Sequence, residues 1–329
     1  MPQTFAAADA VELAVVERSG FVESRHSGIA IVLNPDGTIA EKFGDPGSLI
    51  LPRSSMKPLQ ALACLAAGAP LEGERLGLAT ASHSGTDRHA AVVRDILAVA
   101  GLGEDDLQCP PSWPGDRTTR DEIVRELGAP QRVRMNCSGK HAAMLLACTT
   151  NGWDTTSYLD VDHPLQAYIR EVVERLTGEK VAATAIDGCG APVYAMTLFG
   201  LARAIHRIGN SSTTSPFALH RSAGTLVQAV RDNPWTIQGP DLPDSIVTAQ
   251  TGAFSKHGAE GVQVMVAPDG TTVALKIIDG SSRVGAVVAL RLLERAGALN
   301  AAHVSAATSM LPLSITGGGH DVGAIRPAF

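Results

Sequence analysis

The chain has 329 residues, of which 45% are hydrophobic and 18% charged, and this balance excludes an intrinsically disordered protein. Its 27 basic and 33 acidic residues give a formal net charge of −6, and no run of five basic residues occurs, so we expect no binding to nucleic acid or to an anionic membrane surface. The length fits one large domain or two ordinary ones.

Lysine is scarce in this chain. Only six of the 27 basic residues are lysines and the other 21 are arginines, so arginine supplies most of the surface positive charge. Arginine cannot give up its proton and therefore cannot replace lysine as a general base or a metal ligand. A lysine inside a motif is thus a candidate for chemistry, whereas Lys42, Lys180 and Lys276 are expected to be surface lysines.

The termini and the cysteines predict a cytoplasmic protein. No basic residue precedes Arg18, and Asp9 and Glu12 interrupt the only apolar stretch that a secretory signal would need. No uncharged apolar run of about 18 residues occurs, so no transmembrane helix is expected. Five cysteines, an odd number, are typical of reduced thiols.

Taken in chain order, the sequence predicts strands at both ends and helices between them. The opening segments rich in Val and Ile predict an antiparallel meander over residues 12–18, 27–33 and 38–43. Apolar residues at helical spacing predict helices over 56–67, 87–100, 141–149, 164–176, 192–208 and 217–232. A hairpin is expected over 261–266 and 271–278, then a helix over 283–296, and finally a loop and a strand over 314–325.

This distribution predicts an α+β fold in which one antiparallel sheet is built from both termini around a helical insert. We expect a single domain over 1–329, with the sheet from about 11–50 and 250–329 and the helical region from about 51–249. The βαβ alternation of a doubly wound fold is absent. No Gly-x-Gly-x-x-Gly follows a strand and no Walker sequence occurs, so no nucleotide cofactor is expected.

The first candidate motif is a Ser-x-x-Lys formed by Ser54 and Lys57 at the start of a helix. Three residues are close to one helical turn, so both side chains share a face. A lysine whose pKa is lowered by burial can take the proton of such a serine, as in serine–lysine acylases. The alternative is a helix-capping serine beside a solvated lysine.

The second motif, Ser82-His83, follows the apolar run 76–79 and is expected at the end of a strand. Small hydroxyl residues there can form a site wall with free backbone N–H groups for an oxyanion. The alternative, which local sequence favours, is a polar turn capped by Thr86 or Asp87 before the next helix.

Two loops that precede helices contain cysteine. Cys137 and Lys140 lie three residues apart, and Cys189 lies in the second loop beside Asp187. The two cysteines could bind a soft metal such as zinc, with the lysine amine as a rare third ligand, or they are small buried hydrophobic residues. Cys64 and Cys148 are expected to be core residues.

The segment around Lys256 is glycine-rich and, on local sequence alone, is expected to be a loop with a solvated lysine. It completes a set of five short motifs, which in chain order are 53–58, 81–84, 136–141, 187–189 and 256–261. Together these motifs resemble the thermolabile, Rhizobium-type L-asparaginase family, and the resemblance runs from about residue 11 to 326.

The resemblance implies a fold like that of serine β-lactamases and penicillin-binding proteins, and a homodimer. It implies two Ser-Lys pairs, which here are Ser54 with Lys57 and Ser82 with Lys256. It also implies a zinc site near the active centre, and the matching positions are Cys137, Lys140 and Cys189. The residues in the same motifs that are candidates to hold substrate are Arg53, His83, His141 and Asp187.

The sequence also departs from the expected patterns. Thr86 stands where family members often carry an acidic residue, and the Ser-Asp-Asn and Lys-Thr-Gly elements of β-lactamases are absent in the expected form. The expected reaction is hydrolysis of L-asparagine through an acyl-serine, with Ser54 or Ser82 as nucleophile. The alternatives are a glutaminase, a penicillin-binding-like amidase, or a non-catalytic binding protein on the same scaffold.

Overall fold

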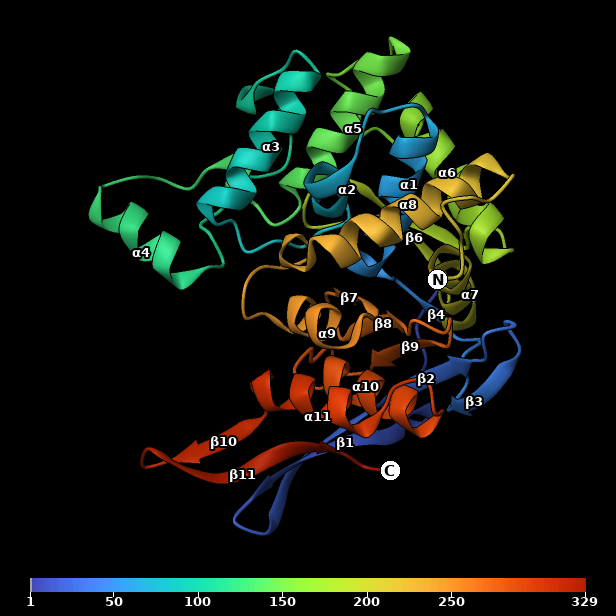
Figure 1. Ribbon diagram of the computed structural model, residues 1–329, viewed down its shortest axis with the longest axis vertical. Coiled ribbons are helices and arrows are strands. Elements are labelled where there is room, and N and C mark those ends of the chain that lie inside the picture. The colour runs from blue at the N-terminus through green and yellow to red at the C-terminus, as the bar shows by residue number, and fades with distance from the viewer. Residues whose placement is uncertain (1) are drawn as a thin grey trace.

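The computed structural model describes residues 2–329. Its larger sheet has eight antiparallel strands in the order β10-β11-β1-β2-β9-β8-β7, with β3 paired to β2. Figure 1 shows this sheet, with the first strands in blue and the last in orange and red. Its strands are β1 (Val11–Arg18), β2 (Phe21–Leu33), β3 (Ile39–Phe43), β7 (Phe254–Gly258), β8 (Val262–Val266), β9 (Thr272–Ile277), β10 (Ser314–Gly317) and β11 (His320–Pro327).

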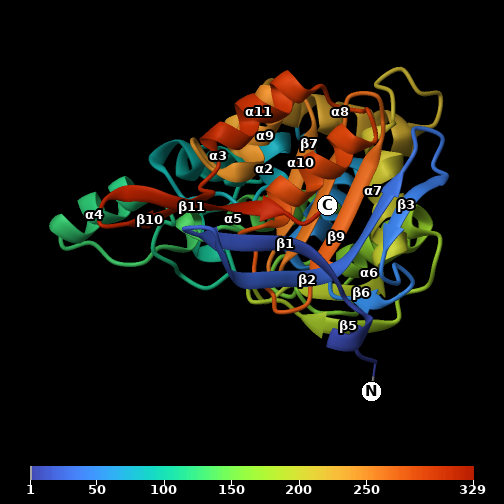
Figure 2. The same ribbon diagram turned by 90° about the horizontal axis from the view of Figure 1, so that it is seen from below.

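The sheet joins the two ends of the chain, as the sequence predicts. Strand β1 pairs with β11, with Ala14 opposite Pro327, and Figure 2 shows these two strands side by side. Strand β2 lies at the centre and pairs with β9, with Ile29 opposite Lys276. The predicted meander of β1, β2 and β3 and the predicted hairpin of β8 and β9 are confirmed by their antiparallel pairing. Strands β10 and β11 replace the expected single last strand.

Eleven α-helices are present in residues 2–329, and most of them lie on one side of the large sheet (Figure 1). They are α1 (Lys57–Ala66), α2 (Gly73–Ala79), α3 (Asp87–Val99), α4 (Arg117–Arg125), α5 (Ser138–Asn151), α6 (Pro164–Thr177), α7 (Leu198–Gly209), α8 (Ala218–Asp232), α9 (Pro243–Thr251), α10 (Gly285–Arg295) and α11 (Ala301–Met310).

Each face of the sheet contributes to its own core, because successive side chains of a strand point to opposite faces. Ile29 and Ile31 of β2 pack into the core shared with α1, α2, α3, α5, α6, α7 and α8. Ala30 and Val32 pack into a second core with α9, α10 and α11. The alternating side chains of β2 thus contact a layer of helices on each face of the sheet. After β6, helix α7 packs against β2 and β9 on the first of these faces.

The helical region differs from the prediction in several places. Residues 192–208, predicted as one helix, form a strand and then α7, because the apolar start of this segment joins a small sheet with the order β4-β6-β5. The run 76–79 before Ser82 is the end of α2 and not a strand. Helices α4 and α9 and strands β4 and β5 were not predicted. The small sheet consists of β4 (Leu49–Ile50), β5 (Ala183–Ile186) and β6 (Pro192–Thr197).

Two lysine predictions are also wrong. Lys256 lies in strand β7 and not in a loop, and its side chain is fully buried. Lys276 is not an outward-facing surface residue, since it is 7% exposed and its amine donates to the carbonyl oxygen of Ile277 (2.7 Å) and to that of Glu260 (2.5 Å). Burial lowers the pKa of Lys276.

In the described part of the chain, no helix has the length and apolar character needed to cross a membrane.

Candidate active site

The candidate site lies where strand β7 passes the start of helix α1. The chain enters α1 through a 3₁₀ turn, η2 (Arg53–Met56). A Cβ atom at Gly258 would lie 2.6 Å from the carbonyl oxygen of Pro52 and 3.1 Å from the backbone nitrogen of Ser55. Only glycine allows these two backbones to approach so closely. The close approach brings Lys256 of β7 beside the segment that carries Ser54 and Lys57.

The hydroxyl of Ser82 lies between two lysine amines. The Nζ of Lys57 is 3.0 Å from Ser82 Oγ, and the Nζ of Lys256 is 2.9 Å from it. The backbone around this serine is fixed, because Ser82 N–H donates to the carbonyl oxygen of Ile237 (3.0 Å) and Ser84 N–H donates to that of Gln238 (2.7 Å). Lysines from a helix and from a strand distant in sequence therefore meet at one hydroxyl.

The amine of Lys57 is surrounded by oxygen atoms. Besides Ser82 Oγ it donates to the carbonyl oxygens of Ala81 (2.6 Å) and Asn136 (3.2 Å). The resemblance pairs this lysine with Ser54, but the structure directs it to Ser82. The Ser54 hydroxyl makes no hydrogen bond to any of residues 2–329 and keeps some solvent exposure, at 9%.

The amine of Lys256 holds its proton less firmly than an ordinary lysine does. Burial lowers its pKa to about 7, and the nearby charge of Lys57 acts in the same direction, while Asp244 opposes it. Its amine donates to the carbonyl oxygen of His257 (2.6 Å) as well as contacting Ser82. Near neutral pH this amine can therefore exchange a proton with the serine.

Arg53 and Asp187 form an ion pair at the edge of the site. The Nε of Arg53 donates to Asp187 Oδ1 at 2.9 Å and its Nη2 lies 2.8 Å from the same oxygen. Arg53 has a φ of +50°, which is uncommon for a residue with a side chain and costs conformational energy. The carboxylate of Asp187 holds one edge of the guanidinium, and Nη1 on the other side lies 3.8 Å from Oε1 of the exposed Glu260.

The two histidines expected to hold substrate lie inside the protein. His83 accepts from Gly85 N–H through Nδ1 (3.2 Å) and lies 2.9 Å from Ser138 Oγ through Nε2. His141 Nδ1 lies 2.8 Å from the hydroxyl of Tyr158. Burial lowers the pKa of His83 well below its usual value and that of His141 to about 4. Both imidazoles are thus neutral groups with protein partners, and their role toward substrate stays a prediction.

The residues of the expected zinc site come together beside Asp187. Lys140 Nζ donates to Cys189 Sγ at 3.1 Å, and Cys137 Sγ donates to Asn136 Oδ1 at 3.4 Å. The neighbouring Cys137 thiol and the charge of Lys140 lower the pKa of Cys189 strongly, whereas the neighbouring Cys189 and burial raise the pKa of Cys137. Burial alone would lower the pKa of Lys140, but the two sulfur atoms raise it on balance.

This donor set fits zinc, since thiolates are soft ligands and a thiolate is already favoured at Cys189. The Nε2 of the neighbouring His141 is buried without a hydrogen-bond partner among the described residues. No three His, Cys, Asp or Glu side chains within residues 2–329 are grouped so as to hold a metal ion. A metal here would therefore need the amine of Lys140 as well as the two sulfur atoms.

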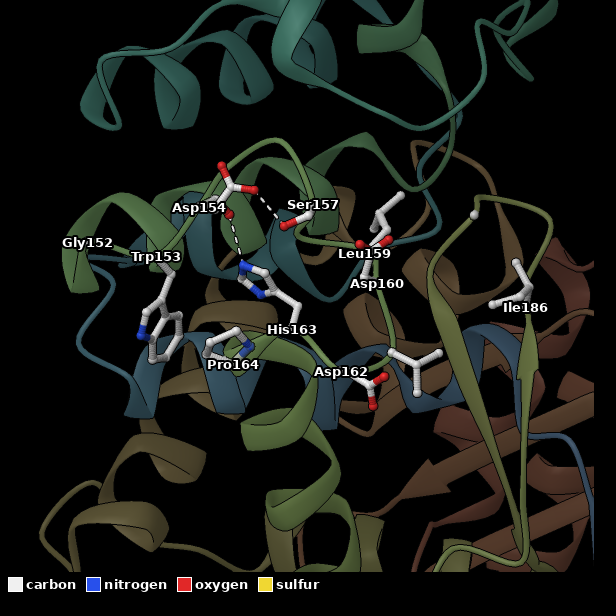
Figure 3. A pocket seen from close by; sticks show the side chains of 12 residues that line it. Gly152, Trp153, Asp154, Ser157, Leu159, Asp160, Asp162, His163, Pro164 and Ile186 are labelled. Carbon is white, nitrogen blue, oxygen red and sulfur yellow. Dashed lines mark hydrogen bonds between the residues drawn. The ribbon is translucent and has the colours of Figure 1, made fainter.

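A wide pocket of about 920 Å³ lies next to this cysteine cluster and is shown in Figure 3. It is formed by the loop 152–164 and the tip of the β5–β6 hairpin, and its lining includes Gly190, the neighbour of Cys189. Within the loop, Ser157 Oγ donates to Asp154 Oδ2 (2.5 Å) and His163 Nε2 lies 2.9 Å from the carbonyl oxygen of Asp154. None of the predicted catalytic residues lines this pocket.

Two residues of the site were missed at the level of sequence. Asp244 is completely buried in α9 and accepts hydrogen bonds from both neighbours of Lys256. His257 was noticed only as part of a motif, and its Nδ1 lies 2.6 Å from Asp244 Oδ2. Asp244 follows a proline in a segment that predicted no element, so the sequence carried no signal for it.

The comparison with protein families agrees with this geometry. The model of the family described as L-asparaginase II matches residues 14–327. The protein is therefore an amidohydrolase. More particularly, the chain belongs to the L-asparaginase II family. No curated protein matches the chain.

Solved structures resemble the chain only distantly. A β-lactamase from Mycobacterium bovis has 16% identity and a TM-score of 0.46, over 82% of this chain and 94% of that one. Mglu in its glutamate form has 15% identity and a TM-score of 0.45, and the match covers 82% of this chain and 60% of that one. A Bacillus glutaminase has 13% identity and a TM-score of 0.37, over 82% and 91% of the two chains.

Proposed function

We propose that this enzyme hydrolyses the side-chain amide of L-asparagine to L-aspartate and ammonia through a serine ester. The observation that carries the proposal is the position of Ser82 Oγ, 3.0 Å from Lys57 Nζ and 2.9 Å from Lys256 Nζ. Membership of the L-asparaginase II family supports asparagine as the substrate. A buried hydroxyl between two amines is suited to moving a proton, which amide hydrolysis requires twice.

Ser54 is assigned as the nucleophile and Ser82 as the proton carrier. The Ser54 hydroxyl has no partner among residues 2–329, and Lys57 follows it by one turn, as in the Ser-x-x-Lys element of serine acylases. Ser54 Oγ attacks the amide carbon, and its proton passes to Lys57 and along Ser82 to Lys256. The carbon–nitrogen bond then breaks, and the leaving nitrogen takes a proton from the same chain and departs as ammonia.

Water completes the reaction by attacking the aspartyl ester. The lysine–serine chain, which has passed the proton of Ser54 to ammonia and is again in its proton-accepting form, removes a proton from this water and returns it to the Ser54 oxygen as aspartate leaves. The pKa of Lys256 near 7 lets it accept and return a proton in the neutral range. Burial of the two amines excludes bulk water, which strengthens the charge interactions that the developing oxyanion needs.

Arg53 is assigned to the α-carboxylate of the substrate. Its guanidinium is held on one side by Asp187, and its side chain is 23% exposed. The Glu260 carboxylate, 3.8 Å from Nη1, is itself 64% exposed, so a substrate carboxylate can displace it and make a two-point contact with the outer N–H groups. Arg53 immediately precedes Ser54, so a carboxylate bound by this side chain places the rest of a small amino acid over the serine. This arrangement favours a short substrate such as asparagine.

Zinc is proposed at Cys137, Lys140 and Cys189, where it would supply charge to orient the bound substrate or to hold two loops together. Metal analysis of protein purified without added zinc tests this assignment. About one zinc per chain is expected, with loss in Cys137→Ser and Cys189→Ser, while Cys64→Ser, in a core helix, keeps the metal. Protein that contains no zinc and is fully active overturns the assignment.

A homodimer is proposed from the family resemblance, and light scattering tests it.

The central experiment measures ammonia release from asparagine and from glutamine by the wild type, Ser54→Ala and Ser82→Ala. Loss of a nucleophile is expected to lower kcat by about 10⁴-fold or more, and loss of a proton carrier by about 10²- to 10⁴-fold. Acid quenching followed by peptide mapping should locate the aspartyl ester on Ser54. An ester on Ser82 exchanges the two roles, and wild-type rates in both variants overturn the serine mechanism. Faster release from glutamine makes the enzyme a glutaminase.

A further inference from the structure

Asp244 is a buried carboxylate with four hydrogen-bond donors. It lies near the start of α9 and is 0% exposed. Its Oδ1 accepts from Ser255 Oγ (2.7 Å) and from Gln263 Nε2 (3.1 Å). Its Oδ2 accepts from the backbone N–H of His257 (2.8 Å) and lies 2.6 Å from His257 Nδ1. Burying a charged carboxylate costs free energy even when all its hydrogen bonds are made, so packing alone does not explain why Asp244 lies here.

The contacts of Asp244 bracket one residue of strand β7. Ser255 and His257 stand on either side of Lys256, and alternate residues of a strand point to opposite faces. Ser255 and His257 therefore face α9 and its carboxylate, while Lys256 faces Ser82 on the other side. The carboxylate thereby fixes the backbone on both sides of the lysine, because a movement of β7 toward or away from Ser82 would break several of these bonds.

Asp244 also supplies charge near the lysine. The titratable groups that act on Lys256 are Asp244 from α9, Lys57 from α1 and Cys137 at the start of α5. His257, beside it on β7, is itself bonded to Asp244, and burial lowers the pKa of that imidazole. Lys57 and burial both disfavour the ammonium form of Lys256. Asp244 and, to a smaller extent, Cys137 favour this form, and the carboxylate has the larger effect of the two.

We propose that Asp244 is a positioning residue for Lys256, clamping strand β7 on either side of that lysine and supplying the buried negative charge that its ammonium form needs. This inference rests on the proposed function, because Lys256 is taken to exchange protons during hydrolysis. It holds whichever serine is the nucleophile, since both lysines meet Ser82 in either case. Asp244 touches no substrate in this scheme and acts only through the lysine.

The test is the pH dependence of kcat/KM for asparagine in the wild type, Asp244→Asn and Asp244→Glu. Removing the negative charge lowers the pKa of Lys256, so the acidic limb of the profile in Asp244→Asn is expected to move about one pH unit or more toward lower pH. Asp244→Glu keeps the charge and disturbs the clamp, so its kcat falls while its acidic limb stays at the wild-type position. The thermal transition of each variant is measured alongside.

The control is Asp154→Asn. The carboxylate of Asp154 also accepts several hydrogen bonds but lies in the loop 152–164, so the pH profile of this variant should match that of the wild type. A limb that does not move in folded Asp244→Asn overturns the inference, whereas failure of the serine variants to lose activity overturns the proposed function. If Asp244→Asn does not fold, Ser255→Ala removes one clamp contact and keeps the charge. A threefold or larger loss of kcat with an unshifted limb is then expected, and unchanged kcat refutes the clamp.

Discussion

The contact between Gly258 and the start of α1 yields a prediction about geometry. In Gly258→Ala the new Cβ would lie 2.6 Å from the carbonyl oxygen of Pro52, and neither backbone has a flexible end that can give way. Ordinary contact begins at 3.4 Å, so β7 and η2 must separate by about 0.8 Å. The hydrogen bond of 2.9 Å between Lys256 and Ser82 must then lengthen or tilt.

The expected result is a large loss of activity with a moderate loss of stability. Overpacking of this kind costs about 1–3 kcal/mol, and a catalytic group misplaced by about 1 Å can lower the rate by about 100-fold. We expect kcat for asparagine to fall by about 30- to 100-fold while the protein remains folded at 25 °C. Ammonia release and urea unfolding measure the two quantities.

Gly103→Ala is the matched control, because its Cβ would meet nothing within 4 Å and its φ of −123° suits any residue. This variant should keep wild-type kcat. If Gly258→Ala retains activity within twofold of the wild type, the spacing between β7 and η2 does not govern the position of Lys256, and the reasoning is wrong.

Three further outcomes are expected. Burial lowers the pKa of His89 to about 4, so as the pH falls from about 6.5 to 4 the unfolded chain binds a proton at this histidine before the folded protein does. The stability advantage of the wild type over His89→Gln should therefore shrink by about 1.4 kcal/mol per pH unit in that window. A constant difference in the free energy of urea unfolding would contradict this. Leu62→Ala in the first core should cost about 2–5 kcal/mol by urea unfolding without changing KM. Arg53→Lys should raise KM for asparagine about tenfold or more with a smaller change in kcat, and an unchanged KM would remove Arg53 from substrate binding.

The sequence predicted the sheet better than the site. The segments rich in Val and Ile and the turn residues between them are local signals, and the structure confirms strands β1, β2, β8 and β9 there. The pairing of Ser82 with both lysines depends on how α1, α2 and β7 pack, so spacing along the chain could only suggest Ser54 as the partner of Lys57. Lys256 and Lys276 misled the local interpretation, because a buried lysine and an exposed one have the same sequence signature until their partners are known.

Asp244 is a residue of the site that local sequence could not identify. A single aspartate after a proline is a common start of a helix, and nothing in its neighbourhood distinguishes a solvated cap from a buried carboxylate. Its function becomes visible only when β7 is placed beside α9. By contrast, the family resemblance did point to three residues far apart in the chain, Cys137, Lys140 and Cys189. The fold brings their side chains together.

The pairing of β1 with β11 also constrains the order in which the protein can fold during synthesis. Strands β1, β2 and β3 leave the ribosome first, but β2 needs β9 and β1 needs β11 to cover their open edges. The apolar strands of the first 43 residues must therefore wait until residues 272–277 and 320–327 have been made. Ser54 and Lys57 are synthesised early, yet the lysine that completes their site arrives about 200 residues later. Until those later strands pair with them, the strands of residues 11–43 keep open edges, where unpaired N–H and C=O groups can pair with other chains.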